Sequence, residues 1–126
     1  MKTLQLKYVN GKYDIIKTGG RTAILDSRIP VQRTQIAEQR LLKAVRDQQS
    51  IYDQDYGLGI AAVIGEKMIN PLQVLMNFER LKRFYAKTRG DSGDLAVLNL
   101  EVGFPTPTSI VCGITLPKEK TTVKVG

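Results

Sequence analysis

Histidine is absent from the 126-residue chain. Histidine is the side chain that most often acts as a general acid or base near neutral pH, and it is a common zinc and iron ligand. Its absence therefore counts against many hydrolases and metalloenzymes. The sequence also has no Walker loop, nucleophile elbow or dinucleotide fingerprint. We expect no enzyme, and no catalytic, cofactor-binding or metal-binding residues.

Cysteine occurs once, as Cys112, so neither an internal disulfide nor a cysteine metal cluster is available. Because Cys112 lies in an apolar stretch, we expect a buried, reduced thiol and a reducing compartment. Long hydrophobic runs are also missing, and the first ten residues alternate lysines with apolar residues, unlike a signal peptide. We expect a soluble protein made in the cytoplasm, with no membrane partner.

The composition is that of one globular domain, with 42% hydrophobic and 25% charged residues. A domain of this size needs no metal or disulfide to be stable. The formal net charge of +7 favours anionic partners. Charge alone does not choose between nucleic acid and an acidic protein surface.

The first 15 residues predict a β-hairpin, because Asn10-Gly11 is the pair that best tolerates a type I′ turn. This turn would pair Tyr8 with Tyr13 and place the apolar and polar side chains on opposite faces. Such a hairpin would pack on one side only. The apolar face would hold Leu4, Leu6, Tyr8, Tyr13 and Ile15.

Two long helices follow. Apolar residues at helical spacing predict the first over 34–49, with Thr34 as its N-cap, and a short apolar helix over 58–64. Asn70-Pro71 predicts the start of the second long helix, since asparagine caps well and proline is tolerated at the first helical position. Arg89-Gly90 predicts its end.

Alternating apolar residues predict two strands, 95–102 and 109–116, joined by the proline-rich connection 103–108. The order of hairpin, helices and hairpin indicates a small single α+β domain, with the C-terminal hairpin packed on the helices. We divide it into an N-terminal hairpin extension (1–33), a core (34–116) and a C-terminal tail (117–126).

The tail has a β-prone segment at 121–125. It is either a frayed end or a strand that pairs with a neighbouring subunit.

One acidic cluster and one basic run carry possible chemistry. Asp53, Asp55 and Glu66 are the only carboxylates that suggest an acid–base pair, but acidic residues beside a turn are usually solvated or cap a helix. The basic run offers either a phosphate-binding stripe or a solvated, protein-binding helix face. Few aromatic residues accompany it, which favours the second interpretation. The run consists of Arg80, Lys82, Arg83, Lys87 and Arg89.

The segment 52–72 resembles the middle of the baseplate wedge family of contractile-tail phages. That family has an aromatic-Asp-x-acidic-aromatic-Gly signature after its first long helix, then a short apolar helix and a capped Pro-Leu helix start, matched here by 58–64 and 70–72. The likeness covers 34–116, including the two final strands. The signature residues here are Tyr52, Asp53, Asp55, Tyr56 and Gly57.

The chain departs from the family at one motif. A Glu-Pro-Arg sequence lies between the last helix and the hairpin in the family, and this chain has residues 85–89 there instead, so only Arg89 carries over. In the family, the motif engages a helical bundle of other wedge subunits. Some members bear a lysozyme label, which the carboxylates here do little to support.

The resemblance implies a structural virion protein of the tail baseplate that initiates the sheath by β-strand exchange. The implied partners are other wedge subunits and the sheath protein, with the tail tube as a further candidate, and several copies in a ring. The alternatives are another small tail or head-completion protein, or a basic nucleic-acid-binding module. The candidate partner-interface residues are Tyr56, Gly57, Arg80, Arg83, Arg89 and Val123.

Overall fold

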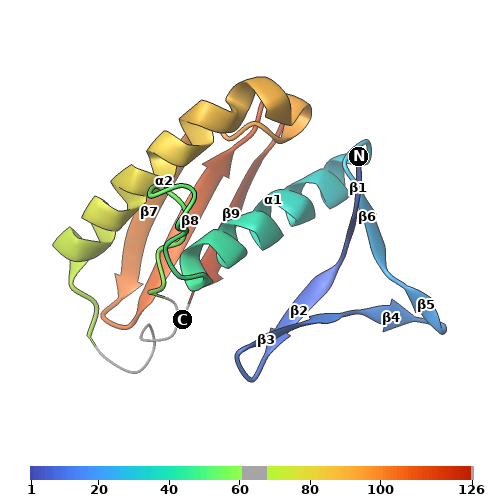
Figure 1. Cartoon of the computed structure of the whole chain (residues 1–126), viewed down its shortest axis with the longest axis horizontal. Coiled ribbons are helices and arrows are strands. Elements are labelled where there is room, and N and C mark those ends of the chain that lie inside the picture. Colours follow the sequence, from blue (N-terminus) through green and yellow to red (C-terminus); the bar gives the residue numbers. More distant parts are fainter. Residues whose placement is uncertain (61–67, 126) are drawn as a thin grey trace.

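The structure, a computed structural model, describes residues 1–60 and 68–125. Two helices, α1 (Pro30–Arg46) and α2 (Pro71–Ser92), lie on one side of an antiparallel sheet (Figure 1). The sheet has the strand order β7-β8-β9. The predicted α+β class is confirmed, with two helices and several antiparallel strands in one small domain. The strands of this sheet are β7 (Asn99–Thr106), β8 (Ser109–Thr115) and β9 (Lys120–Val125).

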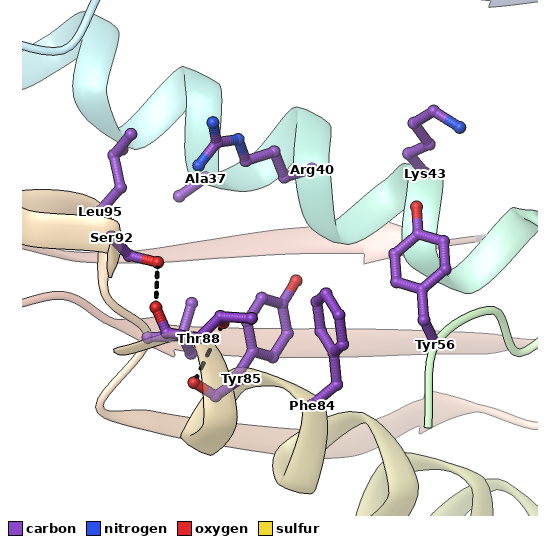
Figure 2. A pocket seen from close by; sticks show the side chains of 10 residues that line it. Ala37, Arg40, Lys43, Tyr56, Phe84, Tyr85, Thr88, Ser92 and Leu95 are labelled. Atoms are coloured by element: carbon purple, nitrogen blue, oxygen red, sulfur yellow. Dashed lines mark hydrogen bonds between the residues drawn. The ribbon is translucent and has the colours of Figure 1, made fainter. Parts of the chain in front are cut away.

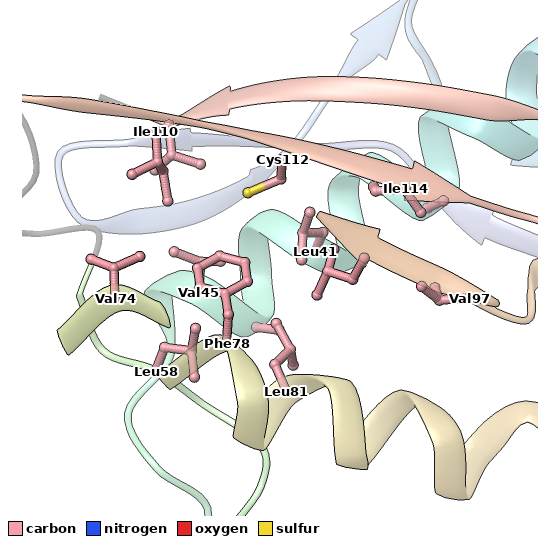
Figure 3. Close-up of a cluster of buried hydrophobic side chains, with 14 of the residues drawn as sticks. Leu41, Val45, Leu58, Val74, Phe78, Leu81, Val97, Ile110, Cys112 and Ile114 are labelled. Carbon is pink, nitrogen blue, oxygen red and sulfur yellow. The ribbon is translucent and has the colours of Figure 1, made fainter. Parts of the chain in front are cut away.

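The core lies between the sheet and the helices (Figure 3). Alternate side chains of the central strand β8 face the helices and are fully buried, as the period of two along a strand requires. Cys112 is among them, so the predicted buried thiol is confirmed, and burial raises its pKa to about 12. The largest fully buried side chains are Phe78, Ile36, Leu41, Leu81, Ile110, Val45 and Cys112.

The first 26 residues form an arm of three antiparallel ladders, which Figure 1 shows as a triangle beside α1. The ladders pair β1 with β6, β2 with β3, and β4 with β5. A small cluster of Leu25, Ile36 and Leu95 attaches this arm to the body. The strands are β1 (Lys2–Leu4), β2 (Leu6–Val9), β3 (Lys12–Ile15), β4 (Lys17–Thr18), β5 (Arg21–Thr22) and β6 (Ile24–Asp26).

The three ladders meet at a closed ring of backbone hydrogen bonds. Gln5 N donates to Ala23 O at 3.0 Å, Ala23 N to Ile16 O at 2.8 Å, and Ile16 N to Gln5 O at 3.2 Å. Each of these residues separates two strands, so the ring satisfies backbone groups that no ladder reaches. We call it the three-way junction.

The predicted N-terminal hairpin is confirmed with its register. Tyr8 lies opposite Tyr13, and the turn residues Asn10 and Gly11 have φ angles of 52° and 76°, as a type I′ turn requires. Leu6, Tyr8 and Tyr13 of the predicted apolar face lie beside α1, where the Arg46 guanidinium is 4.2 Å from the Tyr8 ring centre. Leu4 was wrongly assigned to the hairpin, because it lies in β1 and pairs with Ile24 of β6, and Ile15 is largely exposed.

The first long helix begins earlier than predicted. Helix α1 starts at Pro30, with Ile29 at the cap position and no capping side chain. The N-cap prediction for Thr34 was therefore wrong, and its hydroxyl instead donates to Val31 O at 2.8 Å. Proline fixes φ at a helical value and its missing N–H costs nothing at this position, so Pro30 is the physical start signal. The boundary drawn between 33 and 34 thus falls inside α1.

The second long helix begins where predicted, and its end was misplaced. The Asn70 side chain accepts from Gln73 N, as a cap should. The helix passes through Gly90 and ends at Ser92, followed by a short 3-10 helix at Gly93–Leu95. Gly93, with φ 56°, supplies the stop, because a glycine ends a helix only where the backbone leaves the right-handed region.

The predicted short helix at 58–64 and the carboxylate Glu66 fall largely or wholly on residues 61–67, outside the described residues. The part that is described, 58–60, is not helical.

The C-terminal hairpin is confirmed, with shifted bounds. Strand β7 begins at Asn99, four residues later than predicted, and continues through the proline-rich connection to Thr106. The register shifts between Gly103 and Thr106, which accommodates Pro105 on an edge strand.

The tail 121–125 is neither frayed nor free. It forms most of β9 and pairs with β8 in the same chain, with Val123 opposite Cys112. The Thr121 hydroxyl also donates to the Glu38 carboxylate at 3.0 Å. Most of the tail drawn at 117–126, the segment from Lys120 to Val125, therefore belongs to the sheet.

Candidate protein-interaction site

The segment 47–60, which we call the Asp loop, folds back on the end of α1. Asp47 N, Leu58 N and Ile60 N donate to the last free carbonyls of the helix. The distances are 2.8 Å to Lys43 O, 2.9 Å to Ala44 O and 3.1 Å to Val45 O. Carbonyls at the end of a helix need such partners, so the loop also terminates α1.

Asp53 organises the inside of the loop. Its carboxylate accepts from Asp55 N at 3.0 Å, and its backbone carbonyl accepts from Tyr56 N at 3.2 Å. Ser50 N then donates to Tyr56 O at 3.0 Å, which closes the turn. This is the usual turn-forming action of an aspartate.

Gly57 is required by both conformation and space. Its φ is +89°, and a Cβ built on it would lie 2.0 Å from Gln48 O and 2.6 Å from Gln48 C. A side chain at this position would collide with backbone that cannot swing aside. The contacts within this chain therefore explain why a glycine stands at position 57.

The basic run on α2 holds the Asp loop. Lys87 Nζ lies 2.9 Å from the Asp53 carboxylate and 3.0 Å from that of Asp55, and Arg83 Nε lies 3.4 Å from Asp55. Arg80 donates to Gln54 O at 2.9 Å. We call these contacts the loop clamp. The basic run therefore has intramolecular partners and is not simply a solvated face.

The clamp lowers the pKa of both loop carboxylates. The backbone hydrogen bond from Asp55 and then the Lys87 ammonium lower the pKa of Asp53 below its usual value. The Lys87 ammonium, with a contribution from Arg83, lowers the pKa of Asp55. A general acid needs a raised pKa, so these two residues are poorly suited to donating a proton.

Arg89, the residue carried over from the Glu-Pro-Arg motif, binds elsewhere. Its guanidinium donates to Val97 O at 3.1 Å and to Leu98 O at 2.9 Å, just before β7. It therefore fixes the path of the chain from the 3-10 helix into the sheet.

Tyr56 connects the loop to an aromatic cluster on α2. Its ring lies 5.1 Å from the Phe84 ring, which lies 5.7 Å from the Tyr85 ring. Its hydroxyl donates to the Asp47 carboxylate at 3.2 Å, which also accepts from Tyr13 of the arm at 3.3 Å. The pKa values of the Tyr56 and Tyr13 hydroxyls are both raised, mainly by burial and then by the negative charge of Asp47. The pKa of Tyr13 rises to about 12.

A groove with a volume of about 300 Å³ lies between α1 and α2, beside this cluster (Figure 2). The ring of Tyr85 projects from α2 toward α1, and the Arg40 side chain lies along the α1 wall. We call it the interhelical groove. It is lined by Ala37, Arg40, Lys43, Tyr56, Phe84, Tyr85, Thr88, Ser92, Leu95 and Val97.

The structure brings together four of the six predicted interface residues. Tyr56, Gly57, Arg80 and Arg83 belong to the Asp loop or its clamp, whereas Arg89 and Val123 lie apart from it. The side chain of Val123 packs on the chain's own core, and its backbone lies in β9 opposite Cys112 of β8.

Sequence reasoning did not identify Arg40 and Tyr85 as residues that border one groove. A cation and an aromatic residue on different helices give no local signal that they border one groove.

Among residues 1–60 and 68–125, no group of three or more histidine, cysteine, aspartate or glutamate side chains is placed to hold a metal ion. Within the same ranges, neither helix is long and apolar enough to cross a membrane. Comparisons of the chain with family models, curated proteins and solved structures give no match.

Proposed function

We propose that this protein is a structural subunit of a contractile phage tail or a related injection machine. In this role it joins other baseplate wedge subunits around the tube and starts the sheath by β-strand exchange. The proposal rests on the resemblance of 34–116 to the wedge family, above all on the signature residues 52–57 and the capped helix start at Asn70-Pro71. It also rests on the edges of the C-terminal sheet.

The observation that carries the proposal is the three-stranded sheet. In the described part of the chain, β7 and β9 each pair with β8 alone, so each has one side without a strand partner. A free edge presents a row of N–H and C=O groups that a strand of another chain can pair with. The helices cover one face of the sheet and hold these edges in fixed positions.

The loop clamp supports a structural role. The family signature residues act here as loop-forming and loop-holding residues, with an aspartate turn, a required glycine and ion pairs to α2. The clamp also weighs against the nucleic-acid alternative, because Arg80, Arg83 and Lys87 already have partners.

The first experiment is electron microscopy of negatively stained particles from a mutant that lacks this protein. Tubes with partial baseplates but no sheath are expected, and restored expression of the protein should return sheathed tails. Normal sheathed tails in the mutant would contradict the proposal and favour the alternatives.

A pair of adjacent substitutions tests the strand edge itself. Successive N–H groups point to opposite sides of a strand. Proline has no N–H, so one of the two substitutions Thr121→Pro and Thr122→Pro removes a hydrogen bond to β8, and the other removes an N–H on the unpaired side of β9. Thermal melting identifies the variant that keeps its stability. That variant should fail to restore sheathed tails, and full restoration would exclude β9 as the exchanging edge.

The nucleic-acid alternative has a separate test. Binding to duplex DNA that weakens steeply as salt rises would indicate released counterions and a phosphate-binding surface. We expect weak binding that is unchanged in an Arg83→Gln variant.

A further inference from the structure

The interhelical groove is suited to receiving an apolar side chain. Its volume of about 300 Å³ lies at the lower end of the range of ligand pockets, which is roughly 300–1,000 Å³. Phe84, Tyr85, Leu95 and Val97 supply apolar lining. A space of this size takes one or two side chains and not a large cofactor.

The charged residues that line the groove are all positive. Its lining includes two cations, Arg40 and Lys43, and no aspartate or glutamate. Lys43 is already paired with Asp47. Arg40 has no carboxylate within ion-pair distance among the described residues, and its one described hydrogen bond is to the weakly accepting Met1 sulfur, at 3.3 Å. Arg40 is thus the cation most available to a partner.

A second polar group borders the groove. The Tyr85 hydroxyl extends toward α1 (Figure 2), and it has no hydrogen-bond partner among the described residues. By contrast, the hydroxyls of Thr88 and Ser92 donate to the backbone of α2. A phenol lying between an apolar surface and a free guanidinium fits a ligand that combines an apolar group with a carboxylate.

We propose that the interhelical groove binds a segment of a partner protein that inserts an apolar or aromatic side chain flanked by acidic residues. The inserted side chain packs against Phe84, Tyr85 and Leu95. The neighbouring carboxylate accepts from Arg40. Buried aromatic anchors of this kind supply much of the binding energy at protein interfaces. The inference does not depend on the proposed function.

The test uses the full chain labelled with ¹⁵N and three blocked pentapeptides. The probes are acetyl-Gly-Asp-Phe-Asp-Gly-amide, the same peptide with asparagine in place of aspartate, and the same peptide with alanine in place of phenylalanine. The first should shift the amide signals of Ala37, Thr88 and Leu95. Losing the charges should weaken binding about three- to fivefold, the usual effect of one exposed ion pair. Losing the ring should weaken it at least tenfold.

Variants locate the site. Arg40→Gln should remove the preference for the acidic peptide, and Thr88→Phe should fill the groove and abolish binding. Lys82→Gln, which removes a cation of α2 outside the groove, should leave binding unchanged. Thermal melting checks that each variant is folded. Absence of shifts at the groove, equal binding of all three peptides, or an unchanged preference in Arg40→Gln would each overturn the proposal.

Discussion

At the scale of single residues, Gly57 gives the sharpest expectation. Gly57→Ala should lower the free energy of unfolding by about 3 kcal/mol, because it adds a clash with Gln48 backbone to a positive φ. The matched control is Gly20→Ala, where φ is +77° but nothing lies within 4 Å of the added Cβ. The control should cost only about 1 kcal/mol. Urea denaturation measures both, and equal losses would contradict this account.

The ionised loop carboxylates predict an acid sensitivity. Asp53 and Asp55 have pKa values below 3.8 in the folded state, so the unfolded chain takes up protons first as the pH falls. Their contribution to stability is full above about pH 5 and is lost as the pH falls through the folded pKa values.

The Asp53→Asn/Asp55→Asn double variant should therefore lose less stability than the wild type between about pH 6 and pH 3. Urea midpoints at both pH values give the comparison. A control, Glu79→Gln on the exposed side of α2, should keep the wild-type dependence. If the double variant loses as much stability between about pH 6 and pH 3 as the wild type, the clamp does not stabilise the fold.

Local signals at this scale were readable from the sequence. Asn10-Gly11 predicted the register of its hairpin, and Asn70 predicted the cap of its helix. Both signals are local, because each of these residues interacts with partners no more than four positions away. The loop clamp was not readable. Lys87 and Asp53 lie 34 positions apart, and nothing in the sequence says that α2 returns alongside the Asp loop.

At the scale of elements, Arg33 joins segments that are distant in sequence. It is buried, binds the Glu119 carboxylate in the β8–β9 turn, and donates to Ser27 O at 2.7 Å before α1. The other Glu119 oxygen, Oε2, is also buried and has no hydrogen-bond partner among residues 1–60 and 68–125. Removing the guanidinium would therefore leave a carboxylate that is only 18% exposed without its cation.

Arg33→Met should accordingly cost about 3 kcal/mol of unfolding free energy. The double variant Arg33→Met/Glu119→Met should recover part of this loss, since apolar pairs often replace buried ion pairs well. Arg28→Met, which breaks the exposed pair with Asp26, is the control and should cost less than about 1 kcal/mol. Urea denaturation measures the unfolding free energy of each variant. Equal losses in Arg33→Met and Arg28→Met would show that Arg33 does not hold the distant segments together.

Element boundaries were predicted less well than element types. Thr34 looked like a cap and Gly90 like a stop, but the helices begin and end where the backbone angles change, at Pro30 and Gly93. The tail was ambiguous because a short β-prone segment pairs in the same way within a chain or between chains. Only its place beside β8 resolves this.

At the scale of the whole molecule, the arm and the body should differ in local stability. The arm consists of two-stranded ladders with many exposed side chains, whereas β8 is paired on both sides and buried. Amide hydrogens of β2–β5 should exchange at least about tenfold faster than those of β8. Hydrogen exchange followed by NMR measures this, and equal protection would mean that arm and body unfold together.

The three-way junction determines how the arm itself behaves. Its three hydrogen bonds donate in one direction around the ring. Opening the β2–β3 hairpin therefore breaks the bond between Gln5 and Ile16, and opening the β4–β5 hairpin breaks the bond between Ile16 and Ala23. All the strands it joins lie within 26 residues, so the arm has a low contact order and little loop-closure entropy to overcome. The arm should therefore form quickly, and because the three ladders share the junction, it should open as one cooperative unit.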